Sequence, residues 1–181
     1  MPKAKKSSHV VKNPVTERRF YFVSYSTGEP QIGFLVECLE IVFGSYFELK
    51  RTPLVLESGK SQHDVILGLI GKSAFGVVCL DGLRPNVVFE YGAMRGAGKP
   101  VLLFKEGTAK VDIGHFYADT AALALTPPPI DMDRHFSDTK DRFYVGWSRF
   151  EVKQTLKTIW EAYRKISEEI EGYVEIPEPR L

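Results

Sequence analysis

The polar side chains best suited to chemistry fall within one short segment and are Asp81, Arg84, Asn86 and Glu90. Asn86 and Glu90 are four residues apart, so in a helix both lie on the same face. Glu90 stands between two aromatic residues, and a carboxylate among apolar neighbours needs a partner or a function.

Each of these residues also has an ordinary structural interpretation. Glu90 near a helix start would complement the helix dipole. Arg84 would form a surface salt bridge, and Asn86 would be a helix N-cap. In a functional interpretation, Arg84 would instead pair with a phosphate of a ligand, and Asn86 would hydrogen-bond a hydroxyl of that ligand.

These residues follow a strand and open a helix. Residues 75–80 form a continuous apolar run, which is typical of a strand buried on both faces. The helix predicted over residues 85–97 has Pro85 in its first turn and Gly98 after its end. Gly92 and Gly96 are expected to let this helix approach a neighbouring element closely.

Similar patterns precede and follow this unit. Strands are predicted over residues 20–25, 47–51 and 101–104, and helices over 30–43 and 60–71. Strands that alternate with helices favour a parallel sheet with helices on both faces. Ligands of such sheets bind beyond the carboxyl ends of the strands. We therefore expect the site in the loops after Tyr25 and after Leu80.

The last part of the sequence predicts a fifth strand over residues 143–145 and a long closing helix. Ser148 and Glu151 have the spacing of a capping box at its start. Apolar positions continue along one helical face from Val152 to Ile170, and Gly172 is predicted to end the helix. This helix is expected to pack on the sheet, with a dimer interface as the alternative.

Composition indicates a folded protein of one domain. The 181 residues are 44% hydrophobic and 26% charged, which excludes disorder over most of the chain. No apolar stretch is long enough for a membrane span or a secretory signal. The net charge of +1 argues against dominant nucleic-acid binding and excludes no small ligand.

The charge is unevenly distributed. Residues 1–19 carry six Lys or Arg and one Glu, so the remainder is mildly acidic. The sequence predicts a flexible basic arm over 1–19 and a single domain over 20–181. The arm is either a solvated tail or a weak contact for phosphate or an acidic surface.

The sequence contains no pattern typical of a metal site. Cys38 and Cys79 lie apart in apolar runs, and the four histidines are scattered. Buried free thiols are typical of a reducing compartment, so a cytoplasmic location is expected.

Two nucleotide-binding motifs are incomplete. Residues 93–99 resemble a P-loop, but Ala93 replaces its first glycine and Pro100 its final Ser or Thr. No GxGxxG follows the first strand, so a Rossmann dinucleotide site is not supported.

The segment Asn86-Val-Val-Phe-Glu-Tyr-Gly92, continuing to Gly98-Lys99-Pro100, resembles a pattern shared by two related groups. One is the bacterial Toll/interleukin-1 receptor (TIR)-like predicted nucleotide-binding proteins. The other is the nucleoside 2-deoxyribosyltransferases, which usually carry Gly-Thr where this chain has Pro85-Asn86. The chain is therefore more similar to the TIR-like group.

The resemblance implies a three-layer, flavodoxin-like or TIR-like α/β fold, and a role in bacterial signalling or defence. It implies that Glu90 is the catalytic carboxylate at an N-glycosidic bond. It also implies that the loop after the first strand, with Ser24, Tyr25 and Thr27, binds the ligand beside Asp81, Arg84 and Asn86. Self-association is a further property of that group.

The chemistry of the leaving group favours NAD⁺ as the substrate. A neutral nucleobase must be protonated to leave, which requires a second acid. Nicotinamide is already cationic in NAD⁺ and leaves neutral, so Glu90 alone suffices. Asp81 is the candidate for a second acid. The sequence therefore predicts an NAD⁺ glycohydrolase with NAD⁺ as substrate and no cofactor. The alternatives are a non-catalytic nucleotide-sensing or self-assembling module and a deoxyribosyltransferase-like transferase.

Overall fold

The computed structural model describes residues 18–27, 31–52, 61–81, 84–106 and 145–180. The strands are β1 (Phe20–Ser24), β2 (Glu48–Arg51), β3 (Gly76–Cys79), β4 (Val101–Glu106) and β5 (Val145–Trp147). The helices are α1 (Gln31–Phe43), α2 (Gln62–Lys72), α3 (Pro85–Gly96), α5 (Val152–Lys165) and the 3₁₀ turn η3 (Ser167–Glu169).

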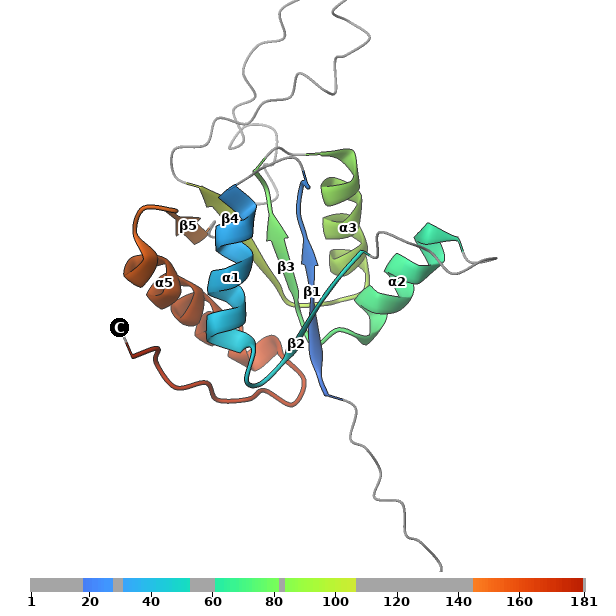
Figure 1. Ribbon diagram of the computed structural model, residues 1–181. Coiled ribbons are helices and arrows are strands. Elements are labelled where there is room, and N and C mark those ends of the chain that lie inside the picture. Colours follow the sequence, from blue (N-terminus) through green and yellow to red (C-terminus); the bar gives the residue numbers. More distant parts are fainter. Residues whose placement is uncertain (1–17, 28–30, 53–60, 82–83, 107–144, 181) are drawn as a thin grey trace, which may run out of the picture.

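The strands form one parallel sheet in the order β2-β1-β3-β4-β5 (Figure 1). The chain runs from β1 outward to β2 and then crosses back to β3, so the order reverses between β1 and β3. This is the flavodoxin-like order, in which ligands bind at the reversal. The predicted α/β class is confirmed.

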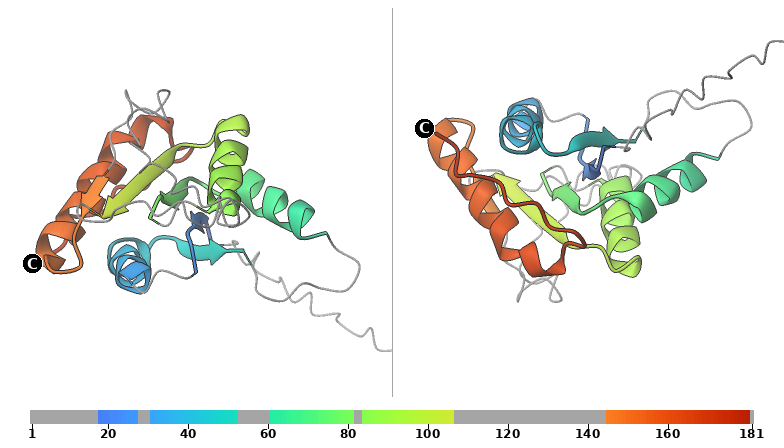
Figure 2. Two further views of the ribbon diagram at one scale, coloured as in Figure 1. Left: turned by 90° about the horizontal axis from the view of Figure 1, so that it is seen from above. Right: turned by 90° about the horizontal axis from the view of Figure 1, so that it is seen from below.

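Helices cover both faces of the sheet, and side chains of β1 point alternately to each. Tyr21 and Val23 pack with residues of α1 and α5, whereas Phe22 packs with residues of α2 and α3. Figure 2 shows the same separation, with α1 and α5 on one side and α2 and α3 on the other. The three-layer prediction is therefore confirmed.

The larger core cluster is built around Phe75, which is fully buried and directly precedes β3. Its ring stacks on Tyr21 at a centroid distance of 5.3 Å. Phe43, Phe47 and Tyr163 contact its edges at 5.3–5.5 Å. One residue thus joins β1, α1, the start of β2 and α5.

Helix α3 approaches the sheet through Met94. A Cβ atom at Gly76 would collide with the Met94 sulfur, which explains a glycine at the start of β3. Gly92 and Gly96 have open space at their Cβ positions, so the expected close approach there is wrong. Gly98 has φ of 68° just after the helix, as its predicted position requires.

The closing helix differs from its prediction at both ends. Glu151, not Ser148, is its N-cap, and it makes no side-chain capping bond. The Thr155 hydroxyl donates to the Ser148 carbonyl at 2.9 Å, which holds Ser148 outside the helix. The fifth strand covers 145–147, and the predicted positions 143 and 144 lie outside the described residues.

The helix also ends earlier, at Lys165. Ile166 and Ile170 nevertheless pack on the core, which explains why the apolar spacing continues. Gly172, with φ of 62°, reverses the chain beyond η3. Because the apolar face of α5 is buried against α1 and β5, the packing prediction is confirmed.

The first described residues are attached to the domain. Arg18 donates to the carbonyl of Gly44, and Arg19 donates to the carbonyls of Glu171 and Gly172. Residues 1–17 of the predicted arm lie outside the described residues. None of the described helices is long and apolar enough to cross a membrane.

We expect Phe75→Ala to lower the free energy of unfolding by about 3–5 kcal/mol, because it leaves a cavity among four aromatic rings. Chemical denaturation followed by circular dichroism measures this loss. Ile41→Ala, at a position on α1 that is 63% exposed, is the control and should change stability by less than about 0.5 kcal/mol. Similar losses in both variants would contradict the assignment of Phe75 to the centre of the core.

Candidate active site

A polar cavity of about 220 Å³ opens at the carboxyl ends of β1 and β2, beside the point where strand order reverses. The described residues that line it come from β1 and its loop, β2 and its loop, α2 and α3. They are Val23, Tyr25, Thr27, Arg51, Thr52, Gln62, Asn86 and Glu90.

Glu90 is the buried acid of this cavity. It belongs to the face of α3 that packs inward with Val87 and Met94, and it is 2% exposed. The Thr52 hydroxyl donates to Glu90 Oε1 at 2.8 Å. Asn86 lies one turn earlier and lines the same cavity, as the four-residue spacing predicts.

Burial controls the ionisation of Glu90. Desolvation raises the pKa of its carboxyl group above the usual value, and the hydroxyls of Thr52 and Ser24 oppose that rise. The bond from Thr52 has good geometry. The Ser24 hydroxyl is close but finds no well-aligned partner among the described residues. The net effect is a carboxylate that is poorly solvated at neutral pH.

Arg84 is held at the start of α3. It is the N-cap residue, in an extended conformation, and Pro85 occupies the first turn. Arg84 Nε donates to Ser26 Oγ at 2.7 Å, which ties α3 to the loop after β1. The N-cap interpretation of Asn86 is therefore wrong, and Arg84 forms no salt bridge with a described acid.

The loop after β1 lies at the cavity. Tyr25 and Thr27 line the cavity, and Ser24 is buried close to Glu90. The Arg51 guanidinium donates to the Tyr25 hydroxyl, which fixes the tyrosine beside the opening.

Asp81 lies apart from this group. Its carboxylate is 1% exposed and accepts the backbone N–H of Glu106 at 3.0 and 3.1 Å. The Cys79 thiol donates to the same carboxylate at 3.0 Å. Asp81 is not among the described residues that line the cavity, and its carboxylate joins β3 to the end of β4.

Sequence reasoning missed Arg51, Thr52 and Gln62. Arg51 and Thr52 follow from the same rule that indicated the other loops, because β2 also ends at this edge of the sheet. Gln62 is the first residue of α2, and the residues between Thr52 and this helix carried no recognisable motif.

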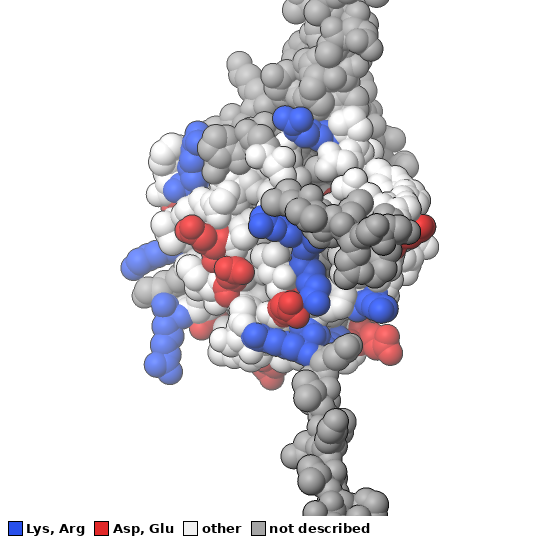
Figure 3. Space-filling view, turned by 45° about the vertical axis from the view of Figure 1, so that its right-hand side comes forward, with Lys and Arg blue, Asp and Glu red and all other residues white. Residues whose placement is uncertain are grey.

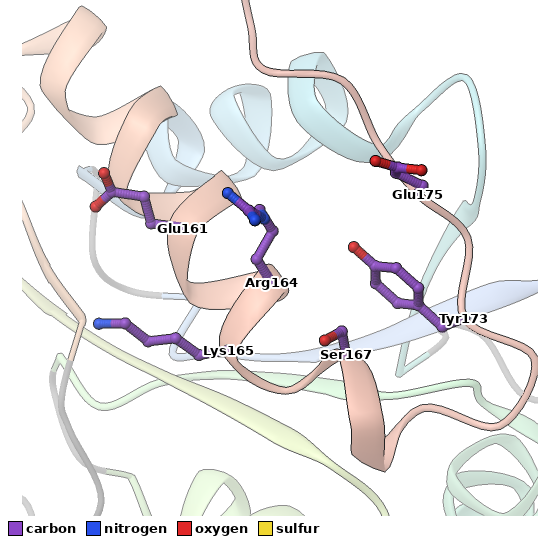
Figure 4. Close-up of a pocket in the computed structure, with 6 residues that line it drawn as sticks. All are labelled: Glu161, Arg164, Lys165, Ser167, Tyr173 and Glu175. Atoms are coloured by element: carbon purple, nitrogen blue, oxygen red, sulfur yellow. The ribbon is translucent and has the colours of Figure 1, made fainter.

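Two larger cavities lack a buried acid. One, of about 520 Å³, lies between α5, which carries Arg164, and the segment after η3, which carries Tyr173 and Glu175 (Figure 4). The described residues that line it are at least partly exposed, and those with charge carry both signs.

The other cavity, of about 560 Å³, lies at the opposite edge of the sheet. Its Lys99 ammonium donates to the Ser73 carbonyl at 2.8 Å, and the Arg19 guanidinium donates to the Gly172 carbonyl, so these cations satisfy backbone carbonyls.

Basic and acidic side chains are interspersed over the face of the molecule shown in Figure 3, so that face does not carry one sign of charge.

The described residues include no group of His, Cys, Asp and Glu that could hold a metal ion. Cys38 and Cys79 are both free and buried, as the sequence predicts. Burial is the main reason that the pKa of each thiol is raised.

No known family matches this sequence, and no curated protein matches it. Among solved structures, the chain is similar to the TIR domains of the activated Roq1 resistosome directly recognizing the pathogen effector XopQ. The TM-score is 0.40 and the identity 16%, over 76% of this chain and 81% of that chain. Similarity of this degree assigns neither family membership nor residue roles. The TIR-like and deoxyribosyltransferase relations and self-association stay predictions.

Glu90→Gln should stabilise the fold at high pH. A folded-state pKa above the unfolded value means that ionised Glu90 costs stability above both values and nothing below both. Gln keeps an oxygen that accepts from Thr52 but carries no charge. We therefore expect a higher Tm than wild type at pH 8, and no difference near pH 4, by scanning calorimetry. A variant that is less stable at pH 8 would contradict the burial of this carboxylate.

Asp81→Ala should lower the free energy of unfolding by about 1–3 kcal/mol, because the buried N–H of Glu106 loses its acceptor. Asp81→Asn keeps an acceptor oxygen and should lose less. Urea denaturation measures both. Losses below about 0.5 kcal/mol for Asp81→Ala would show that this carboxylate is not structural.

Proposed function

We propose that this protein is a nucleotide N-glycosidase that cleaves the nicotinamide–ribose bond of NAD⁺, with Glu90 as its catalytic carboxylate. The observation that carries the proposal is a desolvated carboxylate in a polar cavity at the strand-order reversal. Perturbed acids in such positions are candidates for catalysis.

The reaction matches one buried acid. As the C1′–N bond breaks, its electron pair moves to the nicotinamide nitrogen, and positive charge develops on the ribose. The Glu90 carboxylate stabilises that charge, and it is most effective where water is excluded. Water then adds to C1′ and loses a proton, so that NAD⁺ and water give nicotinamide, ADP-ribose and H⁺.

The position of Asp81 favours a leaving group that is already cationic. Its carboxylate is occupied by Glu106 and Cys79, so among the described residues Glu90 is the only acid lining the cavity. A neutral nucleobase would need a proton donor on its far side. Nicotinamide needs none, which supports NAD⁺ over neutral nucleosides.

The remaining polar groups suit the rest of a nucleotide. Asn86 lies on the Glu90 face of α3 and suits a ribose hydroxyl. Arg84 lies at the N-terminus of α3, where a phosphate meets both a guanidinium and the positive end of the helix.

We expect the purified wild-type chain to release nicotinamide from NAD⁺, measured by chromatography. Glu90→Gln should lower kcat at least about 100-fold, because the transition-state charge loses its partner. Glu161→Gln, at an exposed glutamate on α5, is the matched control and should keep wild-type activity. Because the Glu90 pKa is raised, kcat should fall on the acid side at a higher pH than for an ordinary carboxylate.

Two results would contradict the proposal. One is equal activity in Glu90→Gln and wild type. The other is no nicotinamide release at any protein concentration, with NAD⁺ recovered intact. Saturable binding of intact NAD⁺ in calorimetry would then support the sensing module instead.

A further inference from the structure

The cavity has a side that the proposed reaction does not yet use. Arg51 and Gln62 enter from the β2 side, and neither the sequence motif nor the reaction scheme assigns them a role. Because β2 and β3 flank β1 on opposite sides, the residues that directly follow β2 and those that directly follow β3 lie on opposite sides of β1. Arg84 belongs to the β3 side and Gln62 to the β2 side.

A nucleotide centred on Glu90 would therefore place its two ends differently. Its phosphate would lie on the β3 side, where Arg84 lies. Its base, at the other end of the nucleotide, would then lie on the β2 side. The ring of Tyr25, which follows β1, is half-buried: it packs on the larger core cluster and also lines the cavity. Arg51 of β2 donates to its hydroxyl, which places the ring toward the β2 side. A flat base can stack on such a ring.

Gln62 supplies the hydrogen-bonding group of this side. It is the first residue of α2, and it is exposed at the cavity rather than buried in the core. Its carboxamide forms no hydrogen bond with another described residue. A carboxamide carries a donor and an acceptor side by side, so it pairs in two-bond fashion with another primary amide.

We propose that Gln62 reads the leaving group and selects a base that carries a carboxamide over one that carries a carboxylate. A carboxylate has two acceptors and no donor, so it leaves the Gln62 carbonyl without a partner. The inference rests on the proposed function, because it takes Glu90 as the position of the ribose.

The test compares nicotinamide mononucleotide with nicotinic acid mononucleotide, which differ only in that group. Both are titrated by calorimetry into the full chain carrying Glu90→Gln, so that neither is hydrolysed. We expect the amide to bind about tenfold more tightly, a difference of about 1.4 kcal/mol. Adding Gln62→Leu should bring the ratio of the two dissociation constants close to one.

A matched control separates recognition from general damage. Gln154→Leu, at an exposed glutamine on α5, should leave the ratio at its Glu90→Gln value. Gln62→Lys, which offers donors only, should reverse the preference toward the carboxylate. The second variant keeps the test informative if Gln62→Leu fails to fold.

Two results would overturn this inference. One is that the Glu90→Gln chain, with Gln62 unchanged, binds the two mononucleotides with nearly equal dissociation constants or binds neither of them. The other is a ratio that neither Gln62 variant alters. The proposed function is tested separately by nicotinamide release from NAD⁺ by the wild-type chain. Release without discrimination at Gln62 would reject the inference alone.

Discussion

The site depends on keeping one carboxylate out of water. Glu90 is 2% exposed, and the hydrogen bond from Thr52 only partly replaces the solvent it has lost. A charge in that position costs stability. The same desolvation strengthens any interaction between the carboxylate and a developing positive charge. The property that makes Glu90 costly to the fold is also the property on which its proposed catalytic role rests.

The parallel sheet determines what surrounds this acid. β1, β2 and β3 all end at the same edge, so side chains far apart in sequence meet there: Tyr25 after β1, Thr52 after β2, and Arg84 after β3. The bond from Arg84 to Ser26 joins two of these loops. At the amino ends of the strands, by contrast, the Lys99 ammonium donates to the backbone carbonyl of Ser73.

The fold could be predicted from local patterns because each pattern reports burial directly. The run at 75–80 is apolar because both faces of β3 are covered, and β1 alternates between two core clusters. The sequence predicted too long a closing helix, because Ile166 and Ile170 still pack on the core after the helix has ended. The predicted start of this helix was wrong because the Thr155 hydroxyl donates to the Ser148 carbonyl, a contact that residue spacing cannot reveal. At the cavity, helical spacing was enough to predict that Glu90 and Asn86 share one face of α3. The place of Asp81 outside the cavity lining could not be predicted, because its partner, Glu106, belongs to another strand. Gln62 was missed because only the folded chain brings α2 to the cavity.

The most direct test of the central claim is a crystal structure of the Glu90→Gln chain with intact nicotinamide mononucleotide. We expect the anomeric carbon of the ribose to lie about 3–3.5 Å from the side-chain oxygen or nitrogen at position 90. We also expect the base to lie toward β2 and the phosphate toward the start of α3. A ribose bound elsewhere in the molecule, or turned so that position 90 faces the phosphate, would contradict it.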